Sequence, residues 1–135
     1  MKNIFVVANW KLNPIAEKKA RVLFSNIQDS VREHIEDLGD VEVVICPPFP
    51  YLSALREEQK TDKEEQQIEI GAQDCFWEEK GAFTGEVSSL MLWDMGCKYV
   101  ILGHSERRKY FSETDKIVQK KIKASFAWGL RPIVC

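Results

Sequence analysis

A histidine stands at the end of an apolar run, where packing does not require one. The run Tyr99–Gly103 (YVILG) is followed by His104 and then by the charged stretch Ser105–Phe111 (SERRKYF). This pattern predicts the first turn of a helix, with His104 or Ser105 near its cap. The partial positive charge and unpaired N–H groups of a helix N-terminus oppose protonation of a nearby imidazole. A neutral imidazole can donate a hydrogen bond to a substrate oxygen, so His104 is a candidate electrophile. A structural histidine is the alternative, and no suitably separated base supports Ser105 as a triad nucleophile.

Two polar residues follow the first apolar run, Ile4–Ala8 (IFVVA). Lys11 can point a fixed cation into a pocket at the end of a strand and hold a phosphate or carboxylate there. A surface lysine at the start of a loop is the alternative. Asn9 is either a hydrogen-bond donor to a ligand or a turn former. Position alone leaves both alternatives open.

A long polar segment, Trp77–Glu86 (WEEKGAFTGE), lies between a predicted strand and a predicted helix. Loops of this length in compact units are usually binding or docking loops. Phe83 and Thr84 lie near its middle, and an exposed aromatic residue there would suit insertion into a partner.

Short β-branched runs alternate with longer amphipathic or polar stretches, which predicts parallel strands joined by helical crossovers. The runs are mostly continuous rather than alternating, as in strands covered on both faces. We expect strands over Ile4–Ala8, Val41–Cys46, Ile68–Gln73, Tyr99–Gly103 and Pro132–Cys135.

Two long helices are expected between these strands. The first begins near Asn13-Pro14 and stops at Gly39, and the second runs from a Thr114 cap to Trp128. Their inward stripes are predicted to be Ala16, Ala20, Leu23, Ile27, Val31 and Ile35 in the first, and Ile117, Val118, Ile122 and Phe126 in the second. Shorter helices are expected over Tyr51–Glu58 and Ser88–Met95, and the charged run Glu57–Gln67 is interpreted as a solvated helix end and loop.

Two α/β layouts compete for this pattern. A doubly wound dinucleotide-binding sheet calls for G-x-G-x-x-G after the first strand, where this chain has Asn9-Trp10-Lys11, and no P-loop motif is present either. A (β/α) barrel instead places its chemistry at the carboxyl ends of the strands. Asn9, Lys11 and His104 follow strand ends in this way, which favours the barrel.

Composition limits the class of partner. The 135 residues include 19 basic and 21 acidic side chains, for a net charge of −2. A length of 135 residues fits one domain. The near balance of acidic and basic side chains gives no reason to expect nucleic acid as the partner. The Arg107-Arg108-Lys109 cluster is interpreted as a solvated helix face or a set of ion-pair donors.

The four cysteines (Cys46, Cys75, Cys97 and Cys135) form no C-x-x-C pair and have no histidine at metal-ligand spacing. We interpret them as reduced and structural, with no metal site. The apolar run near the N-terminus has five residues, too few for a signal peptide or a membrane span, so a cytoplasmic location is expected.

Three motifs in order resemble signatures of the triosephosphate isomerase family. They are ANWKLN at Ala8–Asn13, GAFTGE at Gly81–Glu86 and LGHSERR at Leu102–Arg108. The segment GAQD at Gly71–Asp74 also resembles the end of the family's third strand. The resemblance covers essentially the whole chain.

This resemblance implies a (β/α)8 TIM barrel that interconverts dihydroxyacetone phosphate and glyceraldehyde 3-phosphate, without a metal or organic cofactor. Asn9 and Lys11 would contact the phosphorylated triose. His104 would be the neutral electrophile, and this family is the known case of a histidine held neutral by a helix N-terminus. Ser105 and Glu106 would lie just behind these groups. Phe83 and Thr84 would reach the neighbouring subunit of the family's homodimer.

A whole barrel of this kind takes about 250 residues, whereas this sequence stops at Cys135, within the fifth expected strand. We therefore expect a single partial barrel domain over residues 1–135, the N-terminal half of the barrel. The family's general-base glutamate, lid and glycine-rich phosphate loops belong to later strands. Negligible isomerase activity of this chain by itself is expected, together with aggregation or self-association through apolar surface on the fourth and fifth strands. The alternative is a non-catalytic half-barrel that acts in assembly or partner binding.

Overall fold

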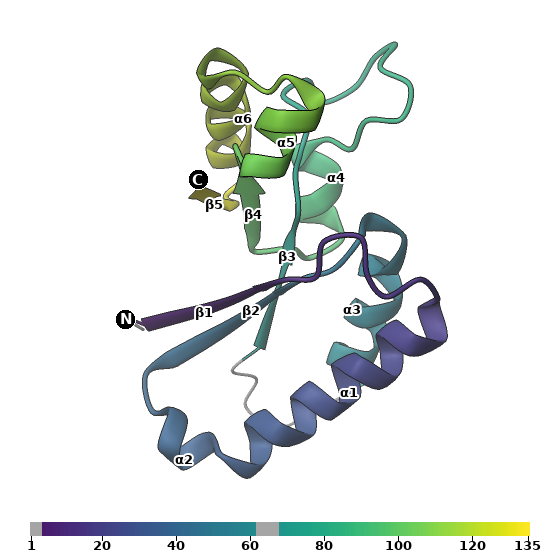
Figure 1. Cartoon of the computed structure of the whole chain (residues 1–135), viewed down its shortest axis with the longest axis vertical. Coiled ribbons are helices and arrows are strands. Elements are labelled where there is room, and N and C mark those ends of the chain that lie inside the picture. The colour runs from purple at the N-terminus through teal and green to yellow at the C-terminus, as the bar shows by residue number, and fades with distance from the viewer. Residues whose placement is uncertain (1–3, 62–67) are drawn as a thin grey trace. The chain divides into compact units, whose positions relative to one another are not determined.

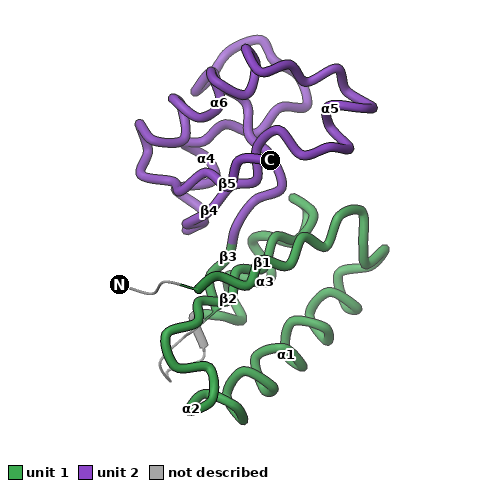
Figure 2. The backbone as a smooth tube through the Cα atoms, turned by 60° about the vertical axis from the view of Figure 1, so that its left-hand side comes forward, with its two compact units in different colours: residues 1–70 green, residues 71–135 purple. Residues whose placement is uncertain are grey.

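The computed structural model describes residues 4–61 and 68–135. The chain divides into two compact units, residues 1–70 and 71–135, which are described separately below (Figure 2). The single partial domain expected over residues 1–135 stays a prediction.

All five strands pair in parallel and in sequence order, β1-β2-β3-β4-β5 (Figure 1). Residues 68–70 of β3 pair with β2, whereas Gly71 and Ala72 pair with β4. The strands are β1 Ile4–Asn9, β2 Val41–Cys46, β3 Ile68–Ala72, β4 Tyr99–Leu102 and β5 Arg131–Val134. This order, with helices in the connections, is that of the N-terminal half of a (β/α)8 barrel, and the predicted fold class is confirmed.

The first unit contains the helices α1 Glu17–Glu33, α2 Ile35–Leu38 and α3 Leu52–Thr61, with a 3-10 turn at Phe49–Tyr51 before α3. The expected start of the first helix is wrong. Its N-cap is Ala16, and the Asn13–Pro14 peptide bond before it is cis. The helix is also interrupted at His34, although Gly39 ends α2 as the expected stop.

The buried face of α1 differs from the predicted stripe. Ala20 and Phe24 are fully buried, whereas Leu23 is 40% exposed. Ala20, Phe24, Ile27 and Val31 follow each other at steps of three and four residues, so they form one helix face. The predicted stripe is therefore wrong at one position, where Phe24 and not its neighbour Leu23 faces inward.

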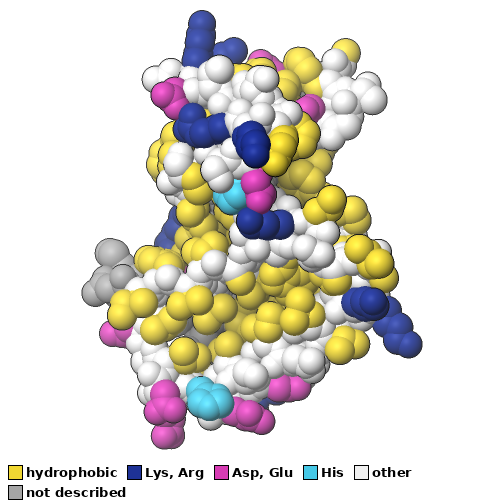
Figure 3. Space-filling model, viewed as in Figure 1, with side chains coloured by type: hydrophobic (Ala, Val, Ile, Leu, Met, Phe, Trp, Pro, Cys, Tyr) yellow, Lys and Arg dark blue, Asp and Glu magenta, His cyan; other side chains and the backbone are white. Residues whose placement is uncertain are grey.

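The predicted coverage of the strands on both faces is confirmed for β4 but wrong for β1. Every residue of β4 is buried, so the apolar exposure expected on the fourth strand is absent. Ile4, Phe5, Val6 and Val7 of β1 are instead 37–59% exposed. Figure 3 shows hydrophobic side chains gathered on the face of the first unit that Figure 1 presents, over the region of β1 and α1.

The second unit contains α4 Ser89–Asp94, α5 Ser105–Phe111 and α6 Asp115–Ala127. The predicted cap is confirmed for α6, where the Thr114 hydroxyl accepts a hydrogen bond from the Ile117 N–H group. The Ser88 hydroxyl caps α4 in the same way.

The inner stripe of α6 is only partly as predicted. Val118 is buried, but Phe126 is 65% exposed. Lys121 and Ser125 take buried positions instead, at 3% and 0% exposure. A polar stripe of this kind requires partners from elsewhere in the unit, which are described below.

Three of the four free cysteines are buried, and Cys135 is exposed. Burial raises the pKa of the Cys75 thiol, which lies 3.6 Å from the Ser125 hydroxyl. The charged run Glu57–Gln67 begins in α3, as expected, and its residues 62–67 lie outside the described residues. The expectation that the run is solvated is wrong at Gln59, which is 1% exposed and donates a hydrogen bond to the Ile68 carbonyl oxygen.

Candidate functional site

His104 lies at the junction between β4 and α5. The buried strand ends at Leu102, and Gly103 then takes a left-handed conformation with φ +71°. A β-carbon at Gly103 would lie 3.1 Å from Val118 Cγ2 and 3.2 Å from the carbonyl oxygen of Cys135. Glycine therefore fits both the backbone conformation and the limited space. His104 is the N-cap of α5, as predicted.

The imidazole of His104 is oriented by the helix that it caps. Its Nδ1 accepts a hydrogen bond from the Glu106 N–H group at 3.2 Å, and Glu106 Oε2 lies 3.5 Å from the same nitrogen. A nitrogen that accepts this bond carries no hydrogen, so the hydrogen of the neutral ring is on Nε2. The arrangement can therefore present Nε2–H as a donor to a ligand oxygen.

Helix α5 has no buried residue of its own. It is held by its two arginines. Arg108 donates to the Gly103 carbonyl oxygen at 2.8 Å and to Asp115 at 2.7 Å. Arg107 Nε lies 2.9 Å from Asp74 Oδ2. The predicted role of this cluster as ion-pair donors is confirmed for both arginines.

Arg107 reaches a buried ionic cluster that sequence reasoning missed. Lys121 Nζ lies 2.7 and 2.9 Å from the two oxygens of Asp74 and also donates to Glu113. The side chains of Lys121, Asp74 and Glu113 are only 4%, 7% and 2% exposed. Burial raises the pKa of Asp74, whereas the hydrogen bonds and charge of Lys121 oppose that rise.

In the first unit, Asn9 and Lys11 form a tight turn after β1. The side-chain oxygen of Asn9 accepts a hydrogen bond from the Lys11 N–H group at 2.9 Å. Lys11 has a left-handed backbone conformation, with φ +56°. Its side chain is exposed. Asn9 thus forms a turn, and that turn holds the lysine backbone in an uncommon conformation.

The predicted site residues fall in both units. Asn9 and Lys11 belong to residues 1–70, whereas His104, Ser105 and Glu106 belong to residues 71–135. The structure brings His104 and Glu106 into contact within the second unit. Ser105 is the first residue of α5. One shared site for the two groups stays a prediction.

The segment Trp77–Glu86 is a loop, as expected. The ring of Phe83 packs against that of Phe76, with centroids 4.7 Å apart, yet Phe83 remains 43% exposed. Thr84 is exposed beside it. The loop is closed at its base by a hydrogen bond from the Phe76 N–H group to the Val87 carbonyl oxygen. Contact of this loop with a second subunit stays a prediction.

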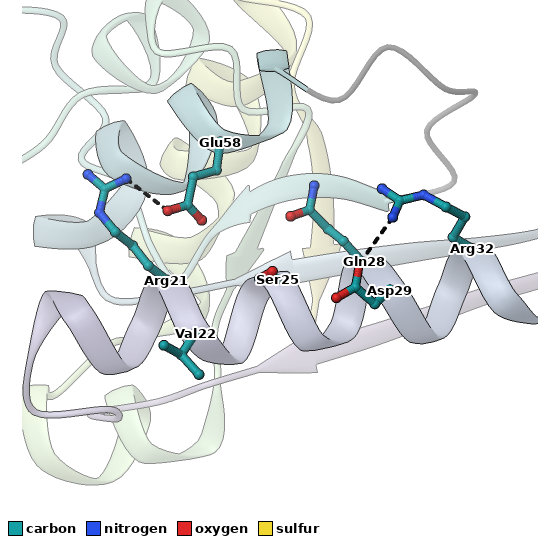
Figure 4. A pocket seen from close by; sticks show the side chains of 7 residues that line it. All are labelled: Arg21, Val22, Ser25, Gln28, Asp29, Arg32 and Glu58. Carbon is teal, nitrogen blue, oxygen red and sulfur yellow. Dashed lines mark hydrogen bonds and ion pairs between the residues drawn. The ribbon is translucent and has the colours of Figure 1, made fainter.

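A cavity of about 470 Å³ lies between α1 and α3 and contains none of the predicted site residues (Figure 4). Its two arginines are already engaged. Arg21 pairs with Glu58 and Arg32 pairs with Asp29, both at 3.0 Å. The hydrogen bonds from Glu58 and Glu17 raise the pKa of Arg21. The cavity is therefore a poor candidate for an anion site.

Across residues 4–61 and 68–135, no cluster of three or more His, Cys, Asp or Glu side chains could hold a metal ion. No helix in these ranges is long and apolar enough to cross a membrane.

Comparison with known proteins gives one family. The model of the family described as triosephosphate isomerase matches residues 4–135. Over 135 residues the chain is 46% identical to a triosephosphate isomerase of Carboxydothermus hydrogenoformans, 45% identical to that of Moorella thermoacetica and 44% identical to that of Alkaliphilus oremlandii. Each match covers 100% of this chain and 50% of the relative, so the chain spans about half the length of these proteins. The chain therefore belongs to the triosephosphate isomerase family.

Proposed function

We propose that this chain supplies the electrophile and a cationic substrate contact of a triose-phosphate isomerase, which interconverts dihydroxyacetone phosphate and glyceraldehyde 3-phosphate. The observation that carries this proposal is the orientation of His104. Its Nδ1 is occupied by the Glu106 N–H group, which leaves Nε2–H as the donor.

The chemistry follows from that donor. A base removes a proton from the carbon beside the carbonyl, and the electrons move onto the carbonyl oxygen to form an enediolate. Nε2–H of His104 donates to that oxygen and stabilises its growing charge. The same nitrogen then passes a proton between the two neighbouring oxygens, and the base returns its proton to the carbon that was the carbonyl carbon, which completes the isomerisation. The positive charge of Lys11 attracts the phosphate and the enediolate. The Asn9 side chain holds the turn that carries Lys11 and also contacts the substrate.

The general base is the part that we do not assign to this chain. Proton abstraction beside a carbonyl requires a positioned base, and the family motifs recognised in the sequence do not include the base glutamate. We therefore propose that the 135 residues act together with a second half-barrel, in a cytoplasmic enzyme of glycolysis and gluconeogenesis. In the complete enzyme, Phe83 and Thr84 contact a second subunit of a homodimer, and neither a metal nor an organic cofactor takes part.

The test is isomerase turnover by the purified chain, alone and after refolding with the separately made C-terminal half of the Carboxydothermus hydrogenoformans relative. We expect turnover only in the mixture. His104→Gln should lower it by about 100-fold or more, whereas the control His34→Gln, in the other unit, should leave it unchanged. Turnover by the chain alone would contradict the claim that another half supplies the base.

The second candidate function is a non-catalytic half-barrel that acts in assembly. The exposed apolar side chains of β1, Ile4 to Val7, favour it. It differs from the isomerase proposal in needing no substrate. Titration of the mixed halves with a phosphate-bearing triose analogue should then show no binding, even when sedimentation shows that the two halves associate.

A further inference from the structure

We propose that Arg107 and the buried cluster of Asp74, Glu113 and Lys121 are positioning residues, which set the orientation of His104 by fixing helix α5. The inference deepens the proposed function, since it concerns the same histidine. All of the residues lie in the second unit, so the argument depends on that unit only.

The first step concerns what holds α5 in place. The helix spans only seven residues, Ser105–Phe111, and buries none of them. Apolar packing therefore contributes little to its position, and a helix this short is not stable by itself. Its orientation must come from polar contacts and from the strand that it follows.

The second step concerns which polar contacts can do this. Arg108 binds the Gly103 carbonyl oxygen and Asp115, but Asp115 is 94% exposed, so that ion pair competes with water. Arg107 instead contacts side chains that are nearly inaccessible to water. Its Nε lies 2.9 Å from Asp74 Oδ2 and 3.7 Å from Glu113 Oε2. Charges interact more strongly in such an environment.

The third step concerns the rigidity of the cluster. Asp74 lies two residues beyond β3, Glu113 lies between α5 and α6, and Lys121 lies on α6. Two carboxylates face two cations, so their charges balance. Burial makes each charge costly without its partners, which restricts the cluster to a narrow set of geometries. The ion pair between Asp74 and Lys121 thereby holds the segment after Ala72 against α6, and Arg107 ties α5 to both.

The fourth step leads to the histidine. Arg107 is three residues from His104, about one helical turn, and His104 is the N-cap of the same helix. The hydrogen bond from the Glu106 N–H group to His104 Nδ1 depends on the position of that first turn. A helix released from the cluster should lose this bond and with it the single orientation of the ring.

The test is nuclear magnetic resonance of the ¹⁵N-labelled chain at a pH of about 8, where a free imidazole is neutral. The chain contains two histidines, His34 and His104, and His34→Gln assigns their signals. Long-range ¹H–¹⁵N correlations show which ring nitrogen carries hydrogen, and the Glu106 amide signal reports the bond to Nδ1. We expect Arg107→Met and Lys121→Met to shift the His104 ring signals toward those of a free imidazole and to shift the Glu106 amide. The signals of His34 should stay in place.

Two controls accompany these variants. Arg107→Lys keeps the charge, so the His104 and Glu106 signals should move only part of the way that they move in Arg107→Met. Lys116→Met is the same change as Lys121→Met at an exposed position of the same helix, and it should leave these signals in place. If Lys121→Met unfolds residues 71–135, the comparison of Arg107→Met with Arg107→Lys tests the inference. Arg107 has 31% of its side chain exposed, so its substitution should disturb folding less. Unchanged His104 and Glu106 signals in a folded Arg107→Met chain would overturn the inference. The readout requires no turnover, so failure of the isomerase proposal would be recognised separately.

Discussion

At the scale of a single residue, the backbone conformation of Lys11 lowers the stability of the fold. Its φ of +56° lies in the left-handed region, where a side chain with a β-carbon is strained by about 1–2 kcal/mol. The turn is held by Asn9, whose side-chain oxygen accepts the Lys11 N–H group. A lysine retained in this conformation, where glycine would be relaxed, is consistent with a requirement for its charge.

This strain can be measured by comparing two substitutions at the same position. Lys11→Gly should relieve it, whereas Lys11→Met should keep it, and both remove the charge. We therefore expect the glycine variant to have the larger free energy of unfolding, by about 1 kcal/mol. Urea unfolding followed by far-ultraviolet circular dichroism of the two variants provides the measurement. Equal stability of the two variants would show that the backbone at this position is unstrained.

At the scale of an element, α6 depends on its first turn. The hydroxyl of Thr114 accepts the Ile117 N–H group, one of the four N–H groups that a helix cannot satisfy internally. Thr114→Ala should lower the free energy of unfolding by about 1 kcal/mol, and Thr114→Ser, which keeps the hydroxyl, should lower it by much less. Chemical denaturation of the three chains under one set of conditions makes the comparison. A serine variant as unstable as the alanine variant would assign the effect to lost packing of the Thr114 methyl group.

The same helix shows what sequence periodicity could and could not predict. The caps at Thr114 and His104 were predictable because they depend on residues adjacent in the sequence. The buried positions of Lys121 and Ser125 were not, since a lysine normally avoids the interior and its partner Asp74 is 47 residues away.

The error at Leu23 in α1 has a different cause. Leu23 and Phe24 are adjacent and both apolar, so the spacing alone does not decide which of them faces inward. Strand positions were predictable to within a residue or so, because β-branched runs are bounded by polar or turn-forming residues.

At the scale of the whole molecule, the predicted site residues are divided between the two compact units. Lys11 and Asn9 belong to one and His104 to the other. Sequence motifs identified all three because each lies at or just beyond the end of a strand. A motif, however, gives no distance between residues so far apart in the chain. The complementation experiment therefore tests more than the source of the base, since turnover in the mixture requires both units to present their groups to one substrate.

The exposed apolar surface of β1 predicts that copies of the chain associate with one another. This strand is at one end of the strand order and pairs with β2 alone among the described strands. Four consecutive apolar residues on such a strand form a template for pairing with another chain. We expect the purified chain to sediment as associated species at micromolar concentration, and Val6→Lys to shift it toward the monomer, because a charge on an end strand opposes pairing.

Val22→Lys is the matched control for this substitution. Val22 is 54% exposed and Val6 is 52% exposed, but Val22 lies on α1, whose backbone hydrogen bonds are satisfied within the helix. If general surface hydrophobicity caused association, the two variants would reduce it equally. A larger effect of Val6→Lys in sedimentation velocity would locate association at β1. A monomeric wild-type chain would instead show that the exposed strand does not drive self-association under these conditions, which would also weaken the case for the half-barrel as an assembly module.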